Sequence, residues 1–323
     1  MKVAIERIEY YLPEKQESSN DLSRDNPDWD VTKIAEKTGI SHRYISSPTE
    51  TVTMMGFEAA TKLFDGGVSR ESIDFLILVT QTPDYSIPTS ACILQNTLQL
   101  NHSVLAFDIN LGCSGFIYAL NISCSLIESK QAKRGIVICS EKYTQHIDLQ
   151  DRTCRPLFSD GAAAVVVGLS NKNAINSFNL GSDGSGYSNL IIPKESDKIK
   201  NSIPGSLFMN GSAVFMFTMN MVPKCINAVL ENANLQINDI DAFIFHQAGK
   251  VVIDEIKKKL KLPSEKVFTN YEKVGNTVSA SIPIALKDAE EEKFLKAGDR
   301  CMLVGFGVGY SWGGCIIEWD GLL

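Results

Sequence analysis

Short runs of apolar, often β-branched residues alternate along this chain with longer segments in which apolar residues recur every three or four positions. Runs of the first kind predict buried strands, and the longer spacing predicts amphipathic helices. The predicted strands are residues 1–13, 73–79, 104–109, 135–139, 162–168, 241–245, 301–305 and 314–319. Helical spacing is clear at residues 52–63 and 252–260. The alternation predicts an α/β fold with buried sheets.

Two pairs of segments repeat at a nearly constant offset. Residues 69–81 (SRESIDFLILVTQ) resemble residues 235–247 (LQINDIDAFIFHQ), and residues 133–141 (KRGIVICSE) resemble residues 298–307 (GDRCMLVGFG). Their Ile-Asp pairs lie 167 positions apart, and their arginines lie 166 positions apart. A shared offset predicts two similar halves, residues 1–170 and 171–323. Residues 182–206 are rich in Ser, Gly, Pro and Lys, which predicts a long loop between the halves that either shapes a binding site or is disordered.

Composition and charge narrow the class of protein. The 323 residues are 44% hydrophobic and 21% charged, which allows a large core. A net charge of -7 argues against nucleic acid as the main partner. The N-terminal run contains charges and no small-residue cleavage site, and no run approaches the ~20 apolar residues of a membrane span. We therefore expect a cytoplasmic protein that does not bind membranes.

The eight cysteines show neither a CxxC pair nor the Cys/His spacing of a zinc site. Most lie in apolar segments, which favours small buried residues in a reducing compartment and no metal site.

Cys113 differs because it lies between the strand predicted at 104–109 and a helical pattern over 114–127. A thiol at a helix N-terminus meets the positive end of the helix dipole, which favours the nucleophilic thiolate. Gly112 and Gly115 would leave room for a substrate to approach the sulfur. Ordinary core packing is the alternative for a single cysteine.

Three further sites carry candidate chemistry. His246 directly follows the predicted strand 241–245, and strand carboxyl ends are where ligands bind in open α/β sheets, although a structural histidine fits equally. Asn276 lies in a Gly-Asn pair that alone indicates a turn. The glycines of residues 305–314 either aim backbone N–H groups at an oxyanion or form a tight strand connection. No Rossmann or Walker glycine pattern is present.

Taken in order, the motifs GCSGF (112–116), HQA (246–248), GNTVSASIP (275–283) and GFGVGYSWG (305–313) resemble those of the ketoacyl-ACP synthase III family, which has the thiolase-like fold. TGISHRYIS (38–46) and FSDGAAAVV (158–166) are similar to two further signatures of that family. The resemblance implies a layered α-β-α-β-α core, with the nucleophilic cysteine in residues 1–170 and the catalytic histidine and asparagine in residues 171–323.

The resemblance also implies a mechanism. Cys113 would take an acyl group from acyl-CoA or an acyl carrier, and malonyl carried on acyl carrier protein would then lose CO₂ and attack it, giving a β-ketoacyl thioester. His246 and Asn276 would donate hydrogen bonds to the malonyl thioester oxygen. The backbone N–H groups of Cys113 and Val308 would form the oxyanion hole. The implied partners are acyl-CoA as a substrate, acyl carrier protein and a second subunit of a homodimer, with no metal or redox cofactor.

Further residues are assigned by the same resemblance. It implies that CoA or substrate is bound by Lys37, Arg152, Met209, Gly211, Phe215 and Ala248, and that Ile87 of one subunit sets the depth of the partner's acyl pocket.

Several positions depart from the family. Lys33 stands where a tryptophan usually stacks on the CoA adenine, with Trp29 four positions earlier. Gly249 and Val251 replace a usual asparagine and an arginine used for carrier docking. The lysines at 250 and 257–259 could replace that basic patch or form a solvated helix face. Ile87 stands where a larger residue is common. These changes favour a specialised synthase over the housekeeping primer of fatty-acid synthesis.

Two other functions remain open. One is an acyltransferase that passes the acyl group to oxygen or nitrogen of a small molecule or sugar, which the presence of Asn276 argues against. The other is a non-catalytic partner subunit, which would be expected to have lost Cys113.

Overall fold

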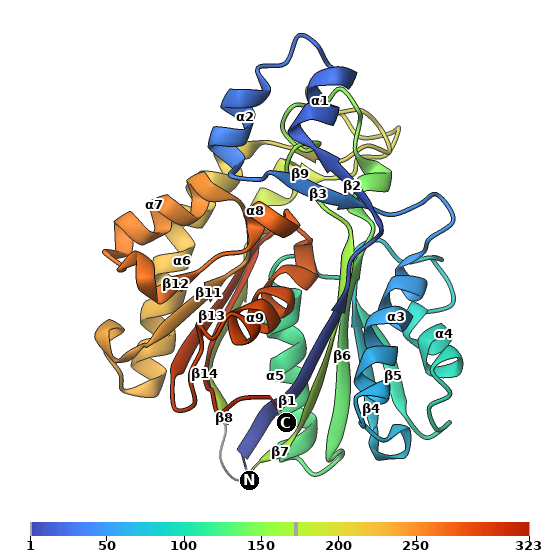
Figure 1. The fold of residues 1–323 in the computed structure, drawn as a ribbon, viewed down its shortest axis with the longest axis vertical. Coiled ribbons are helices and arrows are strands. Elements are labelled where there is room, and N and C mark those ends of the chain that lie inside the picture. The colour runs from blue at the N-terminus through green and yellow to red at the C-terminus, as the bar shows by residue number, and fades with distance from the viewer. Residues whose placement is uncertain (1, 171–173, 323) are drawn as a thin grey trace.

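The computed structural model describes residues 2–170 and 174–322, and two five-stranded sheets form its centre (Figure 1). In the first sheet the strand order is β1-β7-β6-β4-β5, with β1 (Lys2–Tyr11), β4 (Phe75–Val79), β5 (Leu105–Ile109), β6 (Arg134–Glu141) and β7 (Gly161–Ser170). In the second it is β8-β14-β13-β11-β12, with β8 (Ala174–Ser182), β11 (Ala242–Phe245), β12 (Val267–Phe268), β13 (Arg300–Gly307) and β14 (Ser311–Glu318). The two strand orders are equivalent.

Helices alternate with the sheets as layers. Two lie between the sheets, α5 (Gly115–Glu128) and α9 (Ser281–Glu291). The outer face of the first sheet is covered by α3 (Val52–Asp65) and α4 (Ser90–Thr97), and that of the second by α6 (Gly211–Ala233) and α7 (Lys250–Leu260). Each interface between layers is an apolar core. The predicted α-β-α-β-α thiolase-like architecture is confirmed.

Smaller elements lie over one end of the two sheets (Figure 1). They are β2 (Lys15–Ser18), α1 (Ser19–Asp25), α2 (Val31–Thr38), β3 (His42–Ile45), β9 (Leu190–Ile191), β10 (Phe208–Met209) and α8 (Tyr271–Val274).

Strand direction decides where polar loops meet. β4 pairs in parallel with both β5 and β6, and β11 pairs in parallel with both β12 and β13. The carboxyl ends of each set therefore lie at one edge of its sheet, which is where open α/β sheets bind ligands. Cys113 follows β5 and His246 follows β11.

The predicted elements agree closely with the observed ones. Each of the eight predicted strands overlaps an observed strand, and the predicted helices 52–63 and 252–260 correspond to α3 and α7. The repeated segments form β4 and β11 in one pair and β6 and β13 in the other, at equivalent places in the two sheets.

Two expectations need correction. Residues 182–206 do not connect the halves, because β8 precedes this segment and already belongs to the second sheet; it also contains a 3₁₀ helix, Gly184–Asn189, and the short strand β9. One helix, α6, is long and apolar enough to cross a membrane by length and composition, whereas the sequence predicts no run of that kind. Phe217, Val222 and Val229 of α6 are buried against the second sheet, as in the core helix of a globular domain.

We propose that the two sheets are the centres of the two predicted halves, residues 1–170 and 171–323. The first sheet uses strands from residues 2–170 and the second uses strands from residues 174–318. The predicted boundary borders residues 171–173, which lie outside the described residues.

Close packing between α5 and β4 generates a stability prediction. A Cβ at Gly115 would collide with Cγ1 of Val79, which is buried. We expect Gly115→Ala to lower the free energy of unfolding by about 1–3 kcal/mol, because the core has no space for the added methyl group.

Urea unfolding of the purified variants measures this effect. Gly184→Ala is the control, since a Cβ there meets nothing within 4 Å, and it should unfold like the wild type. Equal stability of the Gly115→Ala variant and the control would contradict the packing argument.

Candidate active site

Cys113 lies two residues before α5, and Ser114 occupies the N-cap position between them. Its side chain is only 5% exposed. The backbone N–H groups of Cys113 itself and of Val308 lie near enough to the sulfur to lower the pKa of the thiol. The two N–H groups expected to form an oxyanion hole therefore converge on one point beside the nucleophile candidate.

Strand β13 passes unusually close to Cys113. A Cβ at Gly305 would lie 2.6 Å from the Cys113 carbonyl oxygen, and a Cβ at Gly307 would lie 3.0 Å from the Cys113 sulfur. At position 305 only glycine allows this approach without a shift of the backbone, and at position 307 a larger residue would press on the Cys113 side chain. These two glycines bring the Val308 N–H to the sulfur.

The glycines beside Cys113 have a different role from the one expected. A Cβ at Gly112 would collide with Oε1 of Gln81, and one at Gly115 would collide with Val79. The packing of Val79 thus explains glycine at position 115, whereas the atom next to position 112 is the end of a flexible side chain.

Burial controls the charge of the thiol. Desolvation and, to a smaller extent, the nearby Glu141 carboxyl raise the pKa of Cys113 to about 12, against the opposing effect of the two backbone N–H groups. This direction is opposite to the one expected from the helix N-terminus alone. The resting protein therefore holds a neutral thiol, which must lose its proton as it attacks a substrate.

His246 follows β11 and is 2% exposed. Its Nδ1 atom lies 2.7 Å from the hydroxyl oxygen of Ser281, and its ring meets Phe306 edge to face at 5.6 Å. Burial lowers the pKa of the imidazole to about 3. The ring is therefore neutral near pH 7 and carries one proton. The Ser281 hydroxyl has one proton to donate and also lies 2.9 Å from the Val278 carbonyl oxygen, so the ring proton is on Nε2 only when that hydroxyl donates to Nδ1.

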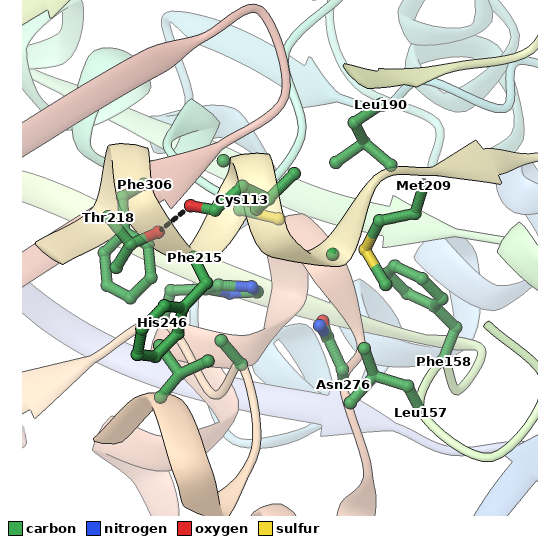
Figure 2. Close-up of a pocket in the computed structure, with 15 residues that line it drawn as sticks. Cys113, Leu157, Phe158, Leu190, Met209, Phe215, Thr218, His246, Asn276 and Phe306 are labelled. Carbon is green, nitrogen blue, oxygen red and sulfur yellow. Dashed lines mark hydrogen bonds between the residues drawn. The ribbon is translucent and has the colours of Figure 1, made fainter. Parts of the chain in front are cut away.

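The backbone of its own loop fixes the orientation of Asn276. The side-chain oxygen Oδ1 accepts a hydrogen bond from the Val278 N–H at 2.9 Å. The main chain of Asn276 bridges to Leu157 and Ser159 through bonds of 3.0 and 2.9 Å. With Oδ1 engaged, the amide nitrogen Nδ2 is the atom available to donate to a ligand. In Figure 2 the tip of Asn276 points into the same space as His246 and Cys113.

These three side chains line one cavity of about 180 Å³. Four residues expected to bind substrate line it too: Met209, Gly211, Phe215 and Ala248. Its other lining residues are Leu157, Phe158, Leu190, Val214, Thr218, Val252, Phe306 and Gly307. No carboxylate or cationic side chain is among these lining residues, so the cavity suits an apolar group next to a few hydrogen-bond donors.

The remaining predicted residues lie elsewhere. Lys37 is in the last turn of α2. The Arg152 guanidinium lies 5.9 Å from the ring centre of Trp29, a tryptophan that is 7% exposed. Ile87 is 86% exposed and does not line the cavity of its own chain.

The sequence does not single out most of the cavity wall. Phe158, Leu190 and Phe306 belong to the motif FSDGAAAVV, the segment 182–206 and the glycine-rich run 305–314, respectively. Nothing in their local spacing distinguishes a wall residue from a core residue. The described residues contain no group of three or more His, Cys, Asp or Glu side chains able to hold a metal ion.

Comparison with known families gives two matches. The family model described as 3-oxoacyl-[acyl-carrier-protein (ACP)] synthase III matches residues 107–184, and the model of its C-terminal part matches residues 230–319.

Individual relatives cover almost the whole chain. The beta-ketoacyl-[acyl-carrier-protein] synthase III of Clostridium tetani is 36% identical over 96% of this chain and 96% of its own length. A crystal structure of a 3-oxoacyl-(acyl-carrier-protein) synthase III superposes with a TM-score of 0.94 at 38% identity, covering 99% of this chain and 100% of the other. The priming beta-ketosynthase of the R1128 polyketide pathway superposes with a TM-score of 0.90 at 30% identity, covering 99% and 97%.

The raised pKa of Cys113 predicts how its alkylation depends on pH. Only the thiolate reacts with iodoacetamide, so the rate should rise about tenfold per pH unit from pH 7 to 9 without levelling off. Mass spectrometry would follow the reaction in a Cys92→Ser background, because Cys92 is exposed.

The same background with Cys113→Ala serves as the control and should show no fast adduct. A rate that levels off below pH 8 would contradict the neutral resting thiol.

Proposed function

This chain belongs to the 3-oxoacyl-[acyl-carrier-protein] synthase III family and is an acyltransferase of the condensing type, and we propose that Cys113, His246 and Asn276 carry out its reaction. The observation that carries the proposal is the convergence of these three side chains on one small cavity. The sulfur meets two backbone donors there, and the amide of Asn276 keeps its nitrogen available.

In the first step the Cys113 sulfur attacks the carbonyl carbon of an acyl thioester, with acyl-CoA as the proposed donor. The carbonyl oxygen becomes an oxyanion, which the N–H groups of Cys113 and Val308 stabilise. The bond to the leaving thiol then breaks, and the proton lost by Cys113 leaves with that thiol. The product is an acyl-enzyme.

In the second step malonyl on acyl carrier protein occupies the cavity. Loss of CO₂ leaves an electron pair that delocalises onto the thioester oxygen as an enolate. In the tautomer in which the Ser281 hydroxyl donates to Nδ1, Nε2–H of His246 donates to that oxygen together with Nδ2–H of Asn276. Both groups are neutral, so neither gives up its proton to the enolate. The enolate carbon attacks the acyl-enzyme carbonyl and forms the new carbon–carbon bond. The bond between that carbonyl carbon and the Cys113 sulfur then breaks, which leaves the β-ketoacyl thioester on the carrier protein, and the Cys113 thiolate takes a proton from solvent water to return to the resting thiol.

The apolar wall supports an acyl chain or the thiol arm of a carrier as the occupant of the cavity. We propose that the nucleotide end of CoA lies toward Lys37 and Arg152. Arg152 already lies over the ring of Trp29. This site therefore differs from one in which a tryptophan ring stacks on the CoA adenine. No metal or redox cofactor enters either step.

Docking of an acidic carrier protein on α7 receives limited support. Lys250 and Lys257 both pair with Asp254, and Lys258 pairs with Glu255. Three of the four proposed lysines therefore form salt bridges with carboxylates of their own helix. This favours a solvated helix face over a docking surface.

We also propose a homodimer formed through β5, the edge strand of the first sheet. Apolar side chains are exposed near this edge, with Leu105 at 50%, Tyr85 at 60% and Ile87 at 86%. An unpaired edge with exposed apolar neighbours is suited to pairing with a second copy. In such a dimer Ile87 would be covered by the partner, where it could limit the depth of the partner's acyl pocket. Cytoplasmic location remains part of the proposal and suits seven buried, unbridged cysteines.

Separate assays of the two half-reactions test the catalytic assignment. Cys113→Ala should lose the mass gain seen when wild-type protein is incubated with acyl-CoA. His246→Ala and Asn276→Ala should still acylate, yet release labelled CO₂ from malonyl-ACP at least ~100-fold more slowly, because each removes a donor to the enolate.

In the alternative outcome, the wild type forms the acyl-enzyme, releases no CO₂ and passes the acyl group to an added alcohol or amine. That result would show acyl transfer to oxygen or nitrogen in place of condensation. Acylation that persists in the Cys113→Ala variant would overturn the nucleophile assignment.

Analytical ultracentrifugation tests the dimer. The wild type should sediment at twice the 35.5 kDa chain mass, and Leu105→Lys should shift it toward the monomer because a charge would be buried at the edge. Leu169→Lys, at another partly exposed leucine of the same sheet, should leave the dimer intact. A monomeric wild type would contradict the proposal.

A further inference from the structure

Glu141 is a buried carboxyl group that the reaction above does not use. It ends β6 and is 0% exposed. The described residues contain no salt bridge to it, so its partners are neutral. Oxygen Oε2 accepts hydrogen bonds from the Gln81 N–H at 3.1 Å and the Thr82 hydroxyl at 3.0 Å, with the Thr80 hydroxyl at 3.4 Å. Oxygen Oε1 accepts from the Ser279 hydroxyl at 2.9 Å.

These bonds connect distant parts of the chain. Gln81 and Thr82 follow β4 of the first sheet, whereas Ser279 belongs to the 3₁₀ helix Val278–Ala280 next to α9. Glu141 and Ser279 are 138 positions apart in sequence. The carboxyl group therefore fastens the 3₁₀ helix against the carboxyl ends of the first sheet.

The 3₁₀ helix in turn holds both proposed enolate donors. The Val278 N–H fixes the side-chain oxygen of Asn276 at 2.9 Å. The Val278 carbonyl oxygen lies 2.9 Å from the Ser281 hydroxyl, which lies 2.7 Å from Nδ1 of His246. A shift of this helix would move Asn276 and His246 together.

We propose that Glu141 is a positioning residue that sets the place of Asn276 and His246 relative to Cys113 through its hydrogen bond to Ser279. The inference rests on the proposed function, because it acts through the residues assigned to the condensation step. The groups that face Glu141 are the backbone and hydroxyls of residues 80–82, Ser279, and the side chains of Cys113, Cys139 and Tyr143, whose pKa values its charge raises.

The protonation state of this carboxyl adds a pH dependence. Burial raises the pKa of Glu141 to about 8, against the opposing effect of its hydrogen bonds. Near neutral pH it is a neutral acid, and at higher pH it becomes a buried anion close to Cys113. We therefore expect condensation to decline above pH 8 as the anion disfavours the thiolate and strains the site.

The first experiment compares Glu141→Gln, Glu141→Ala and Ser279→Ala in the two half-reactions. Glutamine has the shape of the neutral acid, so it should keep the kcat of condensation at pH 7 within about threefold and abolish the decline above pH 8. Glu141→Ala and Ser279→Ala should each lower that kcat at least about tenfold while acyl-enzyme formation stays within about threefold. Glu128→Gln, at an exposed helix end, is the control.

The second experiment uses no substrate. An unfolded glutamate titrates near pH 4.5, whereas the folded Glu141 titrates near 8. Between these values the unfolded chain has released a proton that the folded one retains, so the contribution of Glu141 to wild-type stability falls as pH rises. The melting temperature of the wild type should therefore drop relative to that of Glu141→Gln from pH 5 to pH 8.

Each outcome decides the matter. Unchanged condensation in both alanine variants, or parallel melting curves of the wild type and Glu141→Gln, would overturn the proposal. If Glu141→Ala fails to fold, Ser279→Ala and Glu141→Gln still test it. A wild type that never acylates or releases CO₂ would instead defeat the proposed function, and the melting comparison would still decide whether Glu141 is a buried neutral acid.

Discussion

The close approach of strand β13 to the backbone of Cys113 is the constraint on which the site depends. Gly305 and Gly307 allow the strand to run within van der Waals distance of that residue, and at Gly305 any side chain would collide with the backbone of Cys113 and Ser114. The approach brings the Val308 N–H to the sulfur and makes Phe306 and Gly307 part of the cavity wall. Because β13 belongs to the second sheet and Cys113 follows the first, this contact also fixes how the two sheets meet.

Burial gives the site its electrostatic character. It raises the pKa of the Cys113 thiol and of the Glu141 carboxyl, and it lowers the pKa of the His246 imidazole. All three groups are therefore neutral near pH 7. Negative charge that develops on a substrate oxygen meets oriented N–H dipoles and no fixed anion, and such dipoles act strongly where water is excluded. The same burial makes these groups sensitive to the hydrogen bonds that hold them.

The two sheets have equivalent strand orders and unequal roles. The strand end that carries His246 in the second sheet corresponds to the strand end that carries Thr80 and Gln81 in the first. On the second sheet this place contributes the imidazole, and on the first it contributes donors to Glu141. The same strand end thus supplies the His246 imidazole in the second sheet and the hydrogen-bond donors that hold Glu141 in the first.

The spacing of apolar residues by itself predicted an α/β fold with buried sheets, because that spacing reports local burial. The layering and the roles of Cys113, His246 and Asn276 followed from the resemblance of the sequence motifs to those of the family. Tertiary contacts decided the rest. Glu141 looked like an ordinary strand end until Ser279, 138 positions later, was found to bond to it. Likewise the neighbours of Gly112 and Gly115, the burial of α6 and the rise in the thiol pKa depend on segments far along the chain. Local spacing carries no information about such contacts, since desolvation and packing are set by what the fold brings together.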